Sequence, residues 1–399
     1  MVRVAFHSNH CLPEGPGEQL RVRVATDGRS DELTFSLPKH YHVHNDLVAT
    51  ALLALVGRTY PVVEFNFPIS QRCADTLLSH YQLAEIGPVD PTLEPRQPGR
   101  YVGLNFSGGA DSTAAWVLLR EVFGDDVRVL TSQYWDADHW EVCAARTYAP
   151  DVICATNLRQ LGYDKAGRFN NAVPLLFADY LDLWGIATGH NFEHYYPLTY
   201  VFPRPGGLPP AFIESARSFS AGGLEEVHIL RSLSELGIAR LLVEFVPERI
   251  PLVLQAVAPV RSDKRATRIY HLRKAFLCAG QRPPDYLLRR PQVSPRYNAN
   301  SVVVWGRGLR VARWFGPAEG ALVNGFIATL DPAEYAGLDV DFYERYHPYM
   351  LSFAPDELRR PLAAVFHRAG ILPMNERDHA AMDAVHAYLQ VRGPLSLQR

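Results

Sequence analysis

The chain reads Tyr101-Val-Gly-Leu-Asn-Phe-Ser-Gly-Gly-Ala-Asp-Ser-Thr113 at the point that decides its fold. The residues up to Phe106 are mostly apolar strand formers, and the segment from Thr113 to Leu119 is apolar with helical spacing. A polar turn with two adjacent glycines joins them. Backbone N–H groups at the start of a helix lack partners, and the helix dipole favours negative charge there. The turn therefore predicts an anion site.

The residue types of this turn suit a phosphate. Glycine lets the backbone approach a ligand closely and adopt positive φ, and hydroxyl groups add donors. The turn is neither a Walker-type loop, because no Lys-Ser/Thr pair follows the glycines, nor a G-x-G-x-x-G loop. An ordinary glycine turn in another α/β unit is the alternative. We expect six residues to cradle the nucleotide: Ser107, Gly108, Gly109, Asp111, Ser112 and Thr113.

The letters S-G-G-A-D-S resemble the PP-loop of the ATP pyrophosphatase superfamily, which includes asparagine synthetase, GMP synthetase, tRNA-thiolating enzymes and 7-cyano-7-deazaguanine synthase. The resemblance implies a doubly wound parallel α/β sheet of the adenine-nucleotide α-hydrolase kind. It also implies that the loop holds the pyrophosphate of ATP while a substrate attacks the α-phosphorus. Asp111 and Ser112 would then take part in catalysis, and Asp111 would bind Mg²⁺.

Two further predicted strands end in polar residues. Val127 to Gln133 leads into an aromatic and acidic stretch, where Asp136 could approach magnesium. Ligands bind at the carboxyl ends of strands in doubly wound sheets. A helix N-cap with ordinary packing is the alternative for this stretch.

The other strand, starting at Leu183, ends in Gly189-His190-Asn191 with an acidic residue two positions later. This pattern resembles the second nucleotide-side motif of the PP-loop thiolases and GMP synthetase. Gly189 would allow close approach of ATP. His190 and Asn191 would donate hydrogen bonds to phosphate or substrate, and we assign His190 to catalysis as well.

The basic segment from Lys264 to Phe276 resembles the zinc ribbon of 7-cyano-7-deazaguanine synthase relatives with its cysteines removed. An unrelated basic helix is the alternative. No structural zinc is expected, because aliphatic side chains cannot bind the metal. The positions that correspond to the cysteines are Ala258, Ala266, Ile269 and Leu272.

The leaving pyrophosphate also needs a cationic partner. Lys264, assigned to catalysis, and Arg168 are the candidates that the sequence offers.

Composition bounds the setting. The 399 residues are 47% hydrophobic and 21% charged, which is typical of a soluble globular protein of two or three domains. A formal net charge of −2 gives no electrostatic argument for a membrane or for nucleic acid, although a nucleic-acid substrate stays open. Five cysteines without a C-x-x-C pair, and no secretory pattern at the N-terminus, favour a reducing cytoplasm.

Patterning along the chain predicts three parts. An accessory α+β domain covers 1–96, the PP-loop domain 100–290, and a mainly helical region 291–399, which could close over the site or form a homodimer interface. A proline-rich linker is expected over 87–99, and a lid over 197–210.

Several local predictions accompany this division. A strand is expected over 301–305 and an amphipathic helix over 341–349. If Lys39 to His44 formed a strand, its three histidines would share one face and could bind a metal. A polar strand edge is the alternative.

The resemblance implies an ATP-dependent enzyme that adenylates a carboxylate or amide oxygen of a small, for example nucleobase-like, substrate, after which a nitrogen nucleophile displaces AMP. One alternative is a sulfur transferase of the nucleobase- or tRNA-thiolating kind. Its nearby thiols would be Cys143 and Cys154. We expect catalysis to need neither thiol. A non-catalytic nucleotide-binding partner is the third hypothesis.

Overall fold

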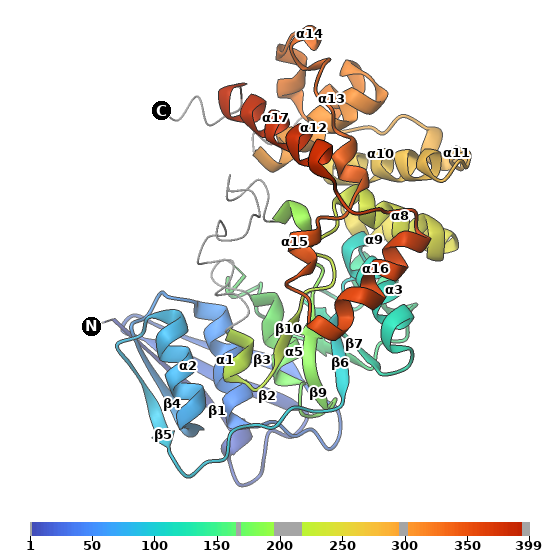
Figure 1. Cartoon of the computed structure of the whole chain (residues 1–399). Coiled ribbons are helices and arrows are strands. Elements are labelled where there is room, and N and C mark those ends of the chain that lie inside the picture. The colour runs from blue at the N-terminus through green and yellow to red at the C-terminus, as the bar shows by residue number, and fades with distance from the viewer. Residues whose placement is uncertain (1, 165–168, 195–217, 295–301, 393–399) are drawn as a thin grey trace. The chain divides into compact units, whose positions relative to one another are not determined.

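The computed structural model describes residues 2–164, 169–194, 218–294 and 302–392 (Figure 1). These residues divide into two compact units. Among the described residues, the first unit comprises 2–107, 123–164, 169–188 and 218–227, and the second comprises 108–122, 189–194, 228–294 and 302–392. This division cuts the chain differently from the three parts expected from its patterning. The expected lid over 197–210 lies outside the described residues.

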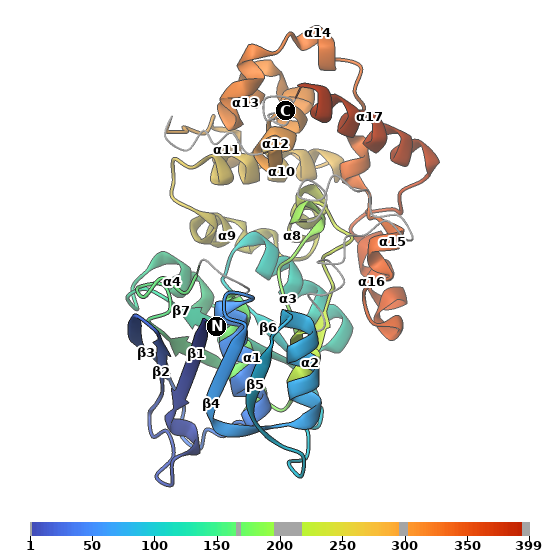
Figure 2. The ribbon, with the colours of Figure 1, turned by 90° about the vertical axis from the view of Figure 1, so that its left-hand side faces the viewer.

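The first unit contains a mixed sheet of five strands in the order β3-β2-β1-β4-β5. Strands β1, β2 and β3 are antiparallel, whereas β4 and β5 run parallel to β1. Figure 2 shows β1, β4 and β5 side by side. The strands are β1 (Arg3–Ser8), β2 (Gln19–Thr26), β3 (Arg29–Ser36), β4 (Val62–Ser70) and β5 (Glu85–Asp90).

Two helices pack on this sheet, α1 (Asn45–Val56) and α2 (Gln71–Tyr81). Every residue of α1 after Asn45 is buried, because its apolar residues surround the helix on all sides. The helix is therefore a buried element of this unit.

The second sheet of this unit is parallel throughout, in the order β10-β9-β6-β7-β8. It confirms the α/β class with a parallel sheet. The chain runs from β6 outward through β7 and β8, then returns to the other side of β6 with β9 and β10. The strands are β6 (Tyr101–Asn105), β7 (Val127–Gln133), β8 (Val152–Ala155), β9 (Leu183–Ala187) and β10 (Glu225–Val227).

Side chains join the two sheets where β3 meets the end of β8. The Asn157 side chain accepts from the Thr34 backbone N–H at 2.9 Å and donates to the Glu32 carbonyl at 2.9 Å. The Ser36 hydroxyl accepts from the Ala155 N–H at 2.8 Å. These groups occupy the open edge of β3, where unpaired backbone groups would otherwise lie.

Helices dominate the second unit. Its longer helices are α3 (Ala110–Phe123, whose last residue falls in the first unit), α8 (Glu235–Phe245), α9 (Ile250–Val257), α10 (Asp263–Cys278), α12 (Val302–Phe315), α16 (Asp356–Arg368) and α17 (Glu376–Arg392). The short helices of both units are α4 (Trp140–Arg146), α5 (Ala172–Leu176), α11 (Asp285–Leu288), α13 (Pro317–Val323), α14 (Pro332–Tyr335) and α15 (Pro348–Leu351). The 3₁₀ turns are η1 (Asn9–Cys11), η2 (Phe169–Asn171), η3 (Phe192–His194), η4 (Pro247–Arg249), η6 (Gly325–Thr329) and η7 (Asp341–Glu344).

Two helix and strand predictions in the C-terminal part are wrong. Residues 302–305, expected as a strand, begin helix α12, because Trp305, Leu309 and Ala312 recur at helical spacing and are all buried. Residues 341–349, expected as one helix, form η7 and α15. Tyr346 between them is extended and bridges to Leu233 and Pro373.

The predicted linker and the histidine strand are also corrected. Residues 85–90 form β5, so the linker starts after Asp90 rather than at Gly87. His40 has a φ of 59° and His44 caps α1, so residues 39–44 form no strand and their histidines share no strand face.

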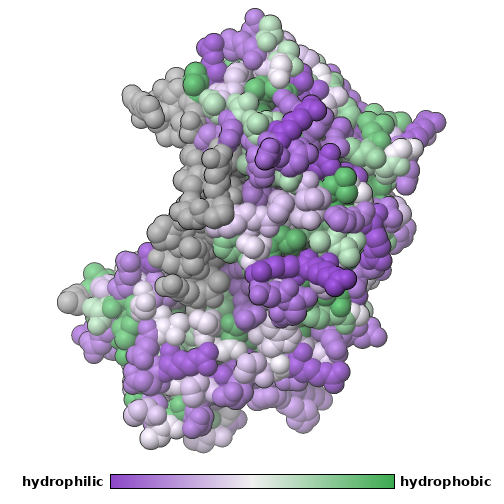
Figure 3. Space-filling view, in the orientation of Figure 1, coloured by the Kyte–Doolittle hydropathy of each residue, from purple (hydrophilic) through white to green (hydrophobic). Residues whose placement is uncertain are grey.

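Among the described residues, no helix combines the length and the apolarity needed to cross a membrane. On the face drawn in Figure 3, apolar residues occur in small groups between polar ones.

The buried Arg96 side chain connects the segment after β5 to other parts of the first unit by hydrogen bonds. The Arg96 Nε donates to Asp179 at 2.5 Å, and its Nη atoms donate to the carbonyls of Gly223 at 3.1 Å and Leu183 at 2.6 Å. Asp179 also accepts from the His44 backbone N–H at 2.6 Å. A single guanidinium thus satisfies several buried acceptors that are distant in sequence.

Arg96→Met should lower the free energy of unfolding by about 3–5 kcal/mol, because it removes the cation paired with the Asp179 carboxylate and a donor to each of the carbonyls. Arg100→Met is the matched control. Its pair with Asp126 is exposed, so its loss should cost no more than about 1 kcal/mol. Urea denaturation followed by circular dichroism measures both. Equal costs would contradict the role assigned to Arg96.

Candidate functional site

The loop between β6 and α3 is closed by its own hydroxyl groups. Gly108 has a φ of 74°, a conformation that favours glycine. The Ser112 hydroxyl donates to the Gly109 carbonyl at 3.1 Å, and the Thr113 hydroxyl to the Gly108 carbonyl at 3.4 Å. Ser112 and Thr113 are buried, whereas Ser107 is exposed. The hydroxyls of Ser112 and Thr113 therefore hold the turn in shape in this structure.

Gly189, which follows β9 and was expected to allow close approach of ATP, lies against this loop. A Cβ added to Gly189 would lie 3.2 Å from the Asp111 Cβ and 3.5 Å from the Ser112 backbone N. The first distance is tighter than ordinary packing. A side chain here would push the two loops apart, and glycine lets the structure bring these three predicted residues together.

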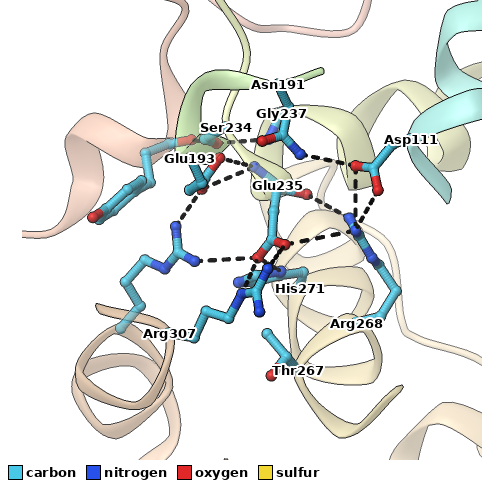
Figure 4. Close-up of polar contacts among 12 residues, drawn as sticks. Asp111, Asn191, Glu193, Ser234, Glu235, Gly237, Thr267, Arg268, His271 and Arg307 are labelled. Atoms are coloured by element: carbon cyan, nitrogen blue, oxygen red, sulfur yellow. Dashed lines mark hydrogen bonds and ion pairs between the residues drawn. The ribbon is translucent and has the colours of Figure 1, made fainter. Parts of the chain in front are cut away.

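Asp111 is the point where the two predicted motifs meet. Its Oδ1 accepts from the Asn191 Nδ2 at 2.9 Å. Both of its oxygens also accept from the Arg268 Nη2, at 3.3 and 3.2 Å (Figure 4). The Asp111 side chain is 24% exposed, and that of Arg268 is 2% exposed.

The cation at Asp111 is therefore not the one expected. Lys264 is exposed on α10, and no contact found among the described residues joins it to Asp111. Arg268 lies four residues later, one helical turn along, on the buried face of the same helix. The basic segment was the only sequence signal for it. Arg168 lies outside the described residues.

Behind Arg268 lies a second carboxylate, Glu235 at the start of α8. Arg307 grips it with two bonds, Nε to Oε2 at 3.0 Å and Nη2 to Oε1 at 2.6 Å. Arg310 donates to Oε2 at 3.3 Å. The Arg268 Nη2 stands 3.8 Å from Oε1, and the His271 Nδ1 3.7 Å from Oε2. Figure 4 shows Glu235 at the centre of this group.

The acidic residue of the Gly-His-Asn motif belongs to the same group. Glu193 accepts from Arg310 and, with both oxygens at 3.0 Å, from the backbone N–H of Glu235. That N–H lies in the first turn of α8, where a carboxylate is favoured by the helix dipole. Glu193 and Arg310 are both almost fully buried. Neither Glu235, Arg307 nor Arg310 was anticipated, because only tertiary packing brings them to the motif.

The formal charges of this group cancel: three carboxylates (Asp111, Glu193, Glu235) against three guanidinium groups (Arg268, Arg307, Arg310) give 3 − 3 = 0. Burial raises the pKa of Glu193 despite Arg310. Burial also opposes ionisation of Glu235, but Arg307 and Arg268 outweigh it and hold its pKa well below the usual value. Burial, with Arg310 nearby, lowers the pKa of His271 well below the usual value, so His271 is neutral.

The structure also places His190 and Asp136. His190 is half-buried in the loop after β9. Asp136, the second predicted magnesium ligand, is exposed in the loop after β7 of the first unit. Among the residues that the structure describes, no group of three or more His, Cys, Asp or Glu side chains could hold a metal. Asp111 fits Mg²⁺ only together with a phosphate, which is the usual way that this ion is bound.

The segment compared with a zinc ribbon is the regular helix α10. Ala266 and Leu272 of this helix are buried, and so is Ala258, which precedes the helix in the sequence.

Comparisons with models of protein families, with characterised proteins and with solved structures find no match to this chain.

The buried His271 predicts a loss of stability in weak acid. Its pKa in the folded protein lies below the usual value of about 6.5, so it takes up a proton only on unfolding. Stability from this group is complete above pH 6.5 and declines as the pH falls, by about 1.4 kcal/mol per pH unit. His347, whose pKa burial lowers to about 3, acts in the same direction.

Urea denaturation of the wild type and of His271→Gln at pH 7.5 and at pH 5.5 separates this contribution. Between these two pH values the wild type should lose about 1 kcal/mol more than the variant. Carboxylates such as Glu193 titrate in both proteins, so the difference isolates His271. Equal losses in the two proteins would show that the pKa of His271 is the same in the folded and the unfolded chain, which would contradict this prediction.

Proposed function

We propose that the protein binds ATP with its phosphates at the loop 107–113 and splits it into AMP and pyrophosphate. The adenylyl group passes to a carboxylate or amide oxygen of a small, for example nucleobase-like, substrate, and a nitrogen nucleophile then displaces AMP. The observation that carries the proposal is the S-G-G-A-D-S loop between a parallel strand and a 14-residue helix, with Gly-His-Asn after the neighbouring strand.

The strand order supports the doubly wound arrangement. The chain leaves β6 toward β7 and β8, and it comes back beside β6 as β9. Sheets of this kind bind ligands outside the carboxyl ends of the strands where the order reverses. The two loops of interest follow β6 and β9, the strands on either side of that reversal.

The residues supply what a departing pyrophosphate requires. The start of α3 offers its dipole, and Gly189 lets the loop after β9 lie close to Asp111. Catalysis of phosphoryl and adenylyl transfer rests mainly on positioning and charge stabilisation. Mg²⁺, held by Asp111 and phosphate oxygens, would add positive charge there. His190 and Asn191 would donate to phosphate or to the acceptor.

The cysteines favour a nitrogen nucleophile over a protein-bound sulfur. Cys154 is fully buried in β8, and burial raises the pKa of its thiol to about 12. Such a thiol is a poor nucleophile at neutral pH. Cys143 is exposed, and its Sγ lies 3.4 Å from the Asp138 carbonyl.

Incubation of the protein with α-labelled ATP, Mg²⁺, ammonium and a small-molecule cell extract should yield labelled AMP and free pyrophosphate. Asp111→Ala should slow AMP formation by at least about a hundredfold, because the loop loses its single carboxylate. Asp285→Ala, which removes an exposed carboxylate of the second unit, should leave the rate unchanged. Thin-layer chromatography measures the products.

ADP and phosphate as the main products would contradict this function. Circular dichroism of each variant shows whether the fold survives, so that a lost rate is not mistaken for a lost structure.

Replacing Cys143 and Cys154 with Ser, singly and together, tests the nucleophile. AMP formation should be retained in all three variants. A drop of about a thousandfold, on the order of 4 kcal/mol in the barrier, would favour sulfur transfer instead, provided that circular dichroism shows an intact fold.

A further inference from the structure

The three arginines of the buried group are held with unequal strength. Arg307 makes a two-bond grip on Glu235, with bonds of 3.0 and 2.6 Å. Arg310 bonds to two carboxylates, Glu193 and Glu235. Arg268 offers Asp111 a single nitrogen, shared between both oxygens at 3.3 and 3.2 Å. Charge-assisted bonds usually measure about 2.7–2.9 Å, so Arg268 has the weakest attachment.

Glu235 holds Arg268 less closely than Asp111 does. Both of its oxygens are already engaged by Arg307, and Arg310 bonds to one of them. The Arg268 Nη2 therefore stands 3.8 Å from the nearest Glu235 oxygen, and its Nη1 reaches only the Glu235 backbone carbonyl, at 3.5 Å. The charge of Arg268 is directed toward residue 111 instead.

The place where Arg268 points is the start of a 14-residue helix. The N–H groups and the dipole of that helix favour an anion, and two residues of the adjacent turn are glycines, which carry no side chain. A guanidinium buried to 2% exposure beside such a helix start is a second cationic element aimed at the same spot. Guanidinium groups match phosphate oxygens well in geometry and charge.

The geometry points to Arg268 as the cation that binds phosphate at this site. In the absence of phosphate Asp111 binds Arg268, and an incoming phosphate displaces the Asp111 carboxylate from it. A phosphate carries more negative charge than a carboxylate and offers more oxygens to the guanidinium. Glu235, Arg307 and Arg310 are positioning residues that keep Arg268 aimed at the loop. The inference rests on the proposed function, because it assumes that the anion is the phosphate chain of ATP.

The inference predicts that Asp111 weakens the binding of metal-free phosphate. If Asp111 competes with phosphate for Arg268, then neutralising it should strengthen binding of metal-free phosphate. Inorganic pyrophosphate in EDTA is the probe, measured by titration calorimetry. Asp111→Asn should bind it about tenfold more tightly than the wild type, and Arg268→Gln about tenfold more weakly.

The double variant separates this exchange from a general charge effect. In the Arg268→Gln background, Asp111→Asn should bring no gain, because the released cation is missing. Arg282→Gln is the matched control. It removes an exposed arginine whose side chain is 80% accessible, and pyrophosphate affinity should stay at the wild-type value.

Two results would overturn the inference. One is a gain from Asp111→Asn that persists without Arg268, which indicates simple charge repulsion. The other is that the wild type binds pyrophosphate and Asp111→Asn leaves this affinity unchanged or weakens it. That result would rule out the role assigned to Arg268 but would leave the proposed ATP function standing. Failure of the wild type and all variants to bind either pyrophosphate or ATP would remove the proposed function and the inference together.

Arg268→Gln could unfold the second unit, since it leaves Asp111 without its cation. Circular dichroism detects this. Arg268→Lys then replaces it, because lysine keeps the charge but loses the planar fork. The affinity gain from Asp111→Asn should be several-fold smaller beside lysine than beside arginine, and an undiminished gain would contradict the inference.

Discussion

The grip of Arg307 and Arg310 on the buried Glu235 carboxylate is the interaction on which the rest of the site depends. It joins the start of α8 to α12, and through Glu193 it reaches the loop after β9. With Glu235 saturated in this way, Arg268 is left for Asp111. Helix α12, which lies in the region expected to be a C-terminal appendage, thus contributes Arg307 and Arg310 to the buried group that contains Asp111.

A buried network of charges is energetically unfavourable to form. Desolvating ions costs several kcal/mol each, and apolar residues of similar size often stabilise a fold as well or better. The equal numbers of acids and arginines limit this cost, since every buried charge has a partner. The network provides direction: Arg307 and Arg310 hold Glu235, and Arg268 contacts the Asp111 carboxylate at a defined place. This is a function that apolar packing could not perform.

Local pattern was enough to predict much of the fold. The strands β6, β7 and β9 and the helix α3 lie where apolar runs and helical spacing predicted them. The pattern failed where tertiary contacts decided the outcome. Valines at 302–304 favour a strand, yet α12 forms because a helical face from Trp305 onward is buried. β5 escaped notice because Gly87 and Pro88, which usually mark loops, lie inside it.

The candidate site also contains residues that local motifs predicted and residues that only tertiary contacts bring together. The residues expected at two short motifs, Asp111, Gly189 and Asn191, do meet, because β6 and β9 are neighbours and their ends coincide. The expected cation, Lys264, is one helical turn away from the residue that makes the contact, since no sequence signal says which turn of α10 lies against the loop. Glu235 and its arginines come from helices separated by about seventy residues, and no motif links them.

Hydrogen–deuterium exchange with and without ATP and Mg²⁺ tests most directly whether the loop and α10 form one nucleotide site. The account predicts slower amide exchange on ATP binding in three segments: 108–113, 189–193 and 264–272. Protection confined to other parts of the chain, or protection of the loop without any change around Arg268, would contradict it.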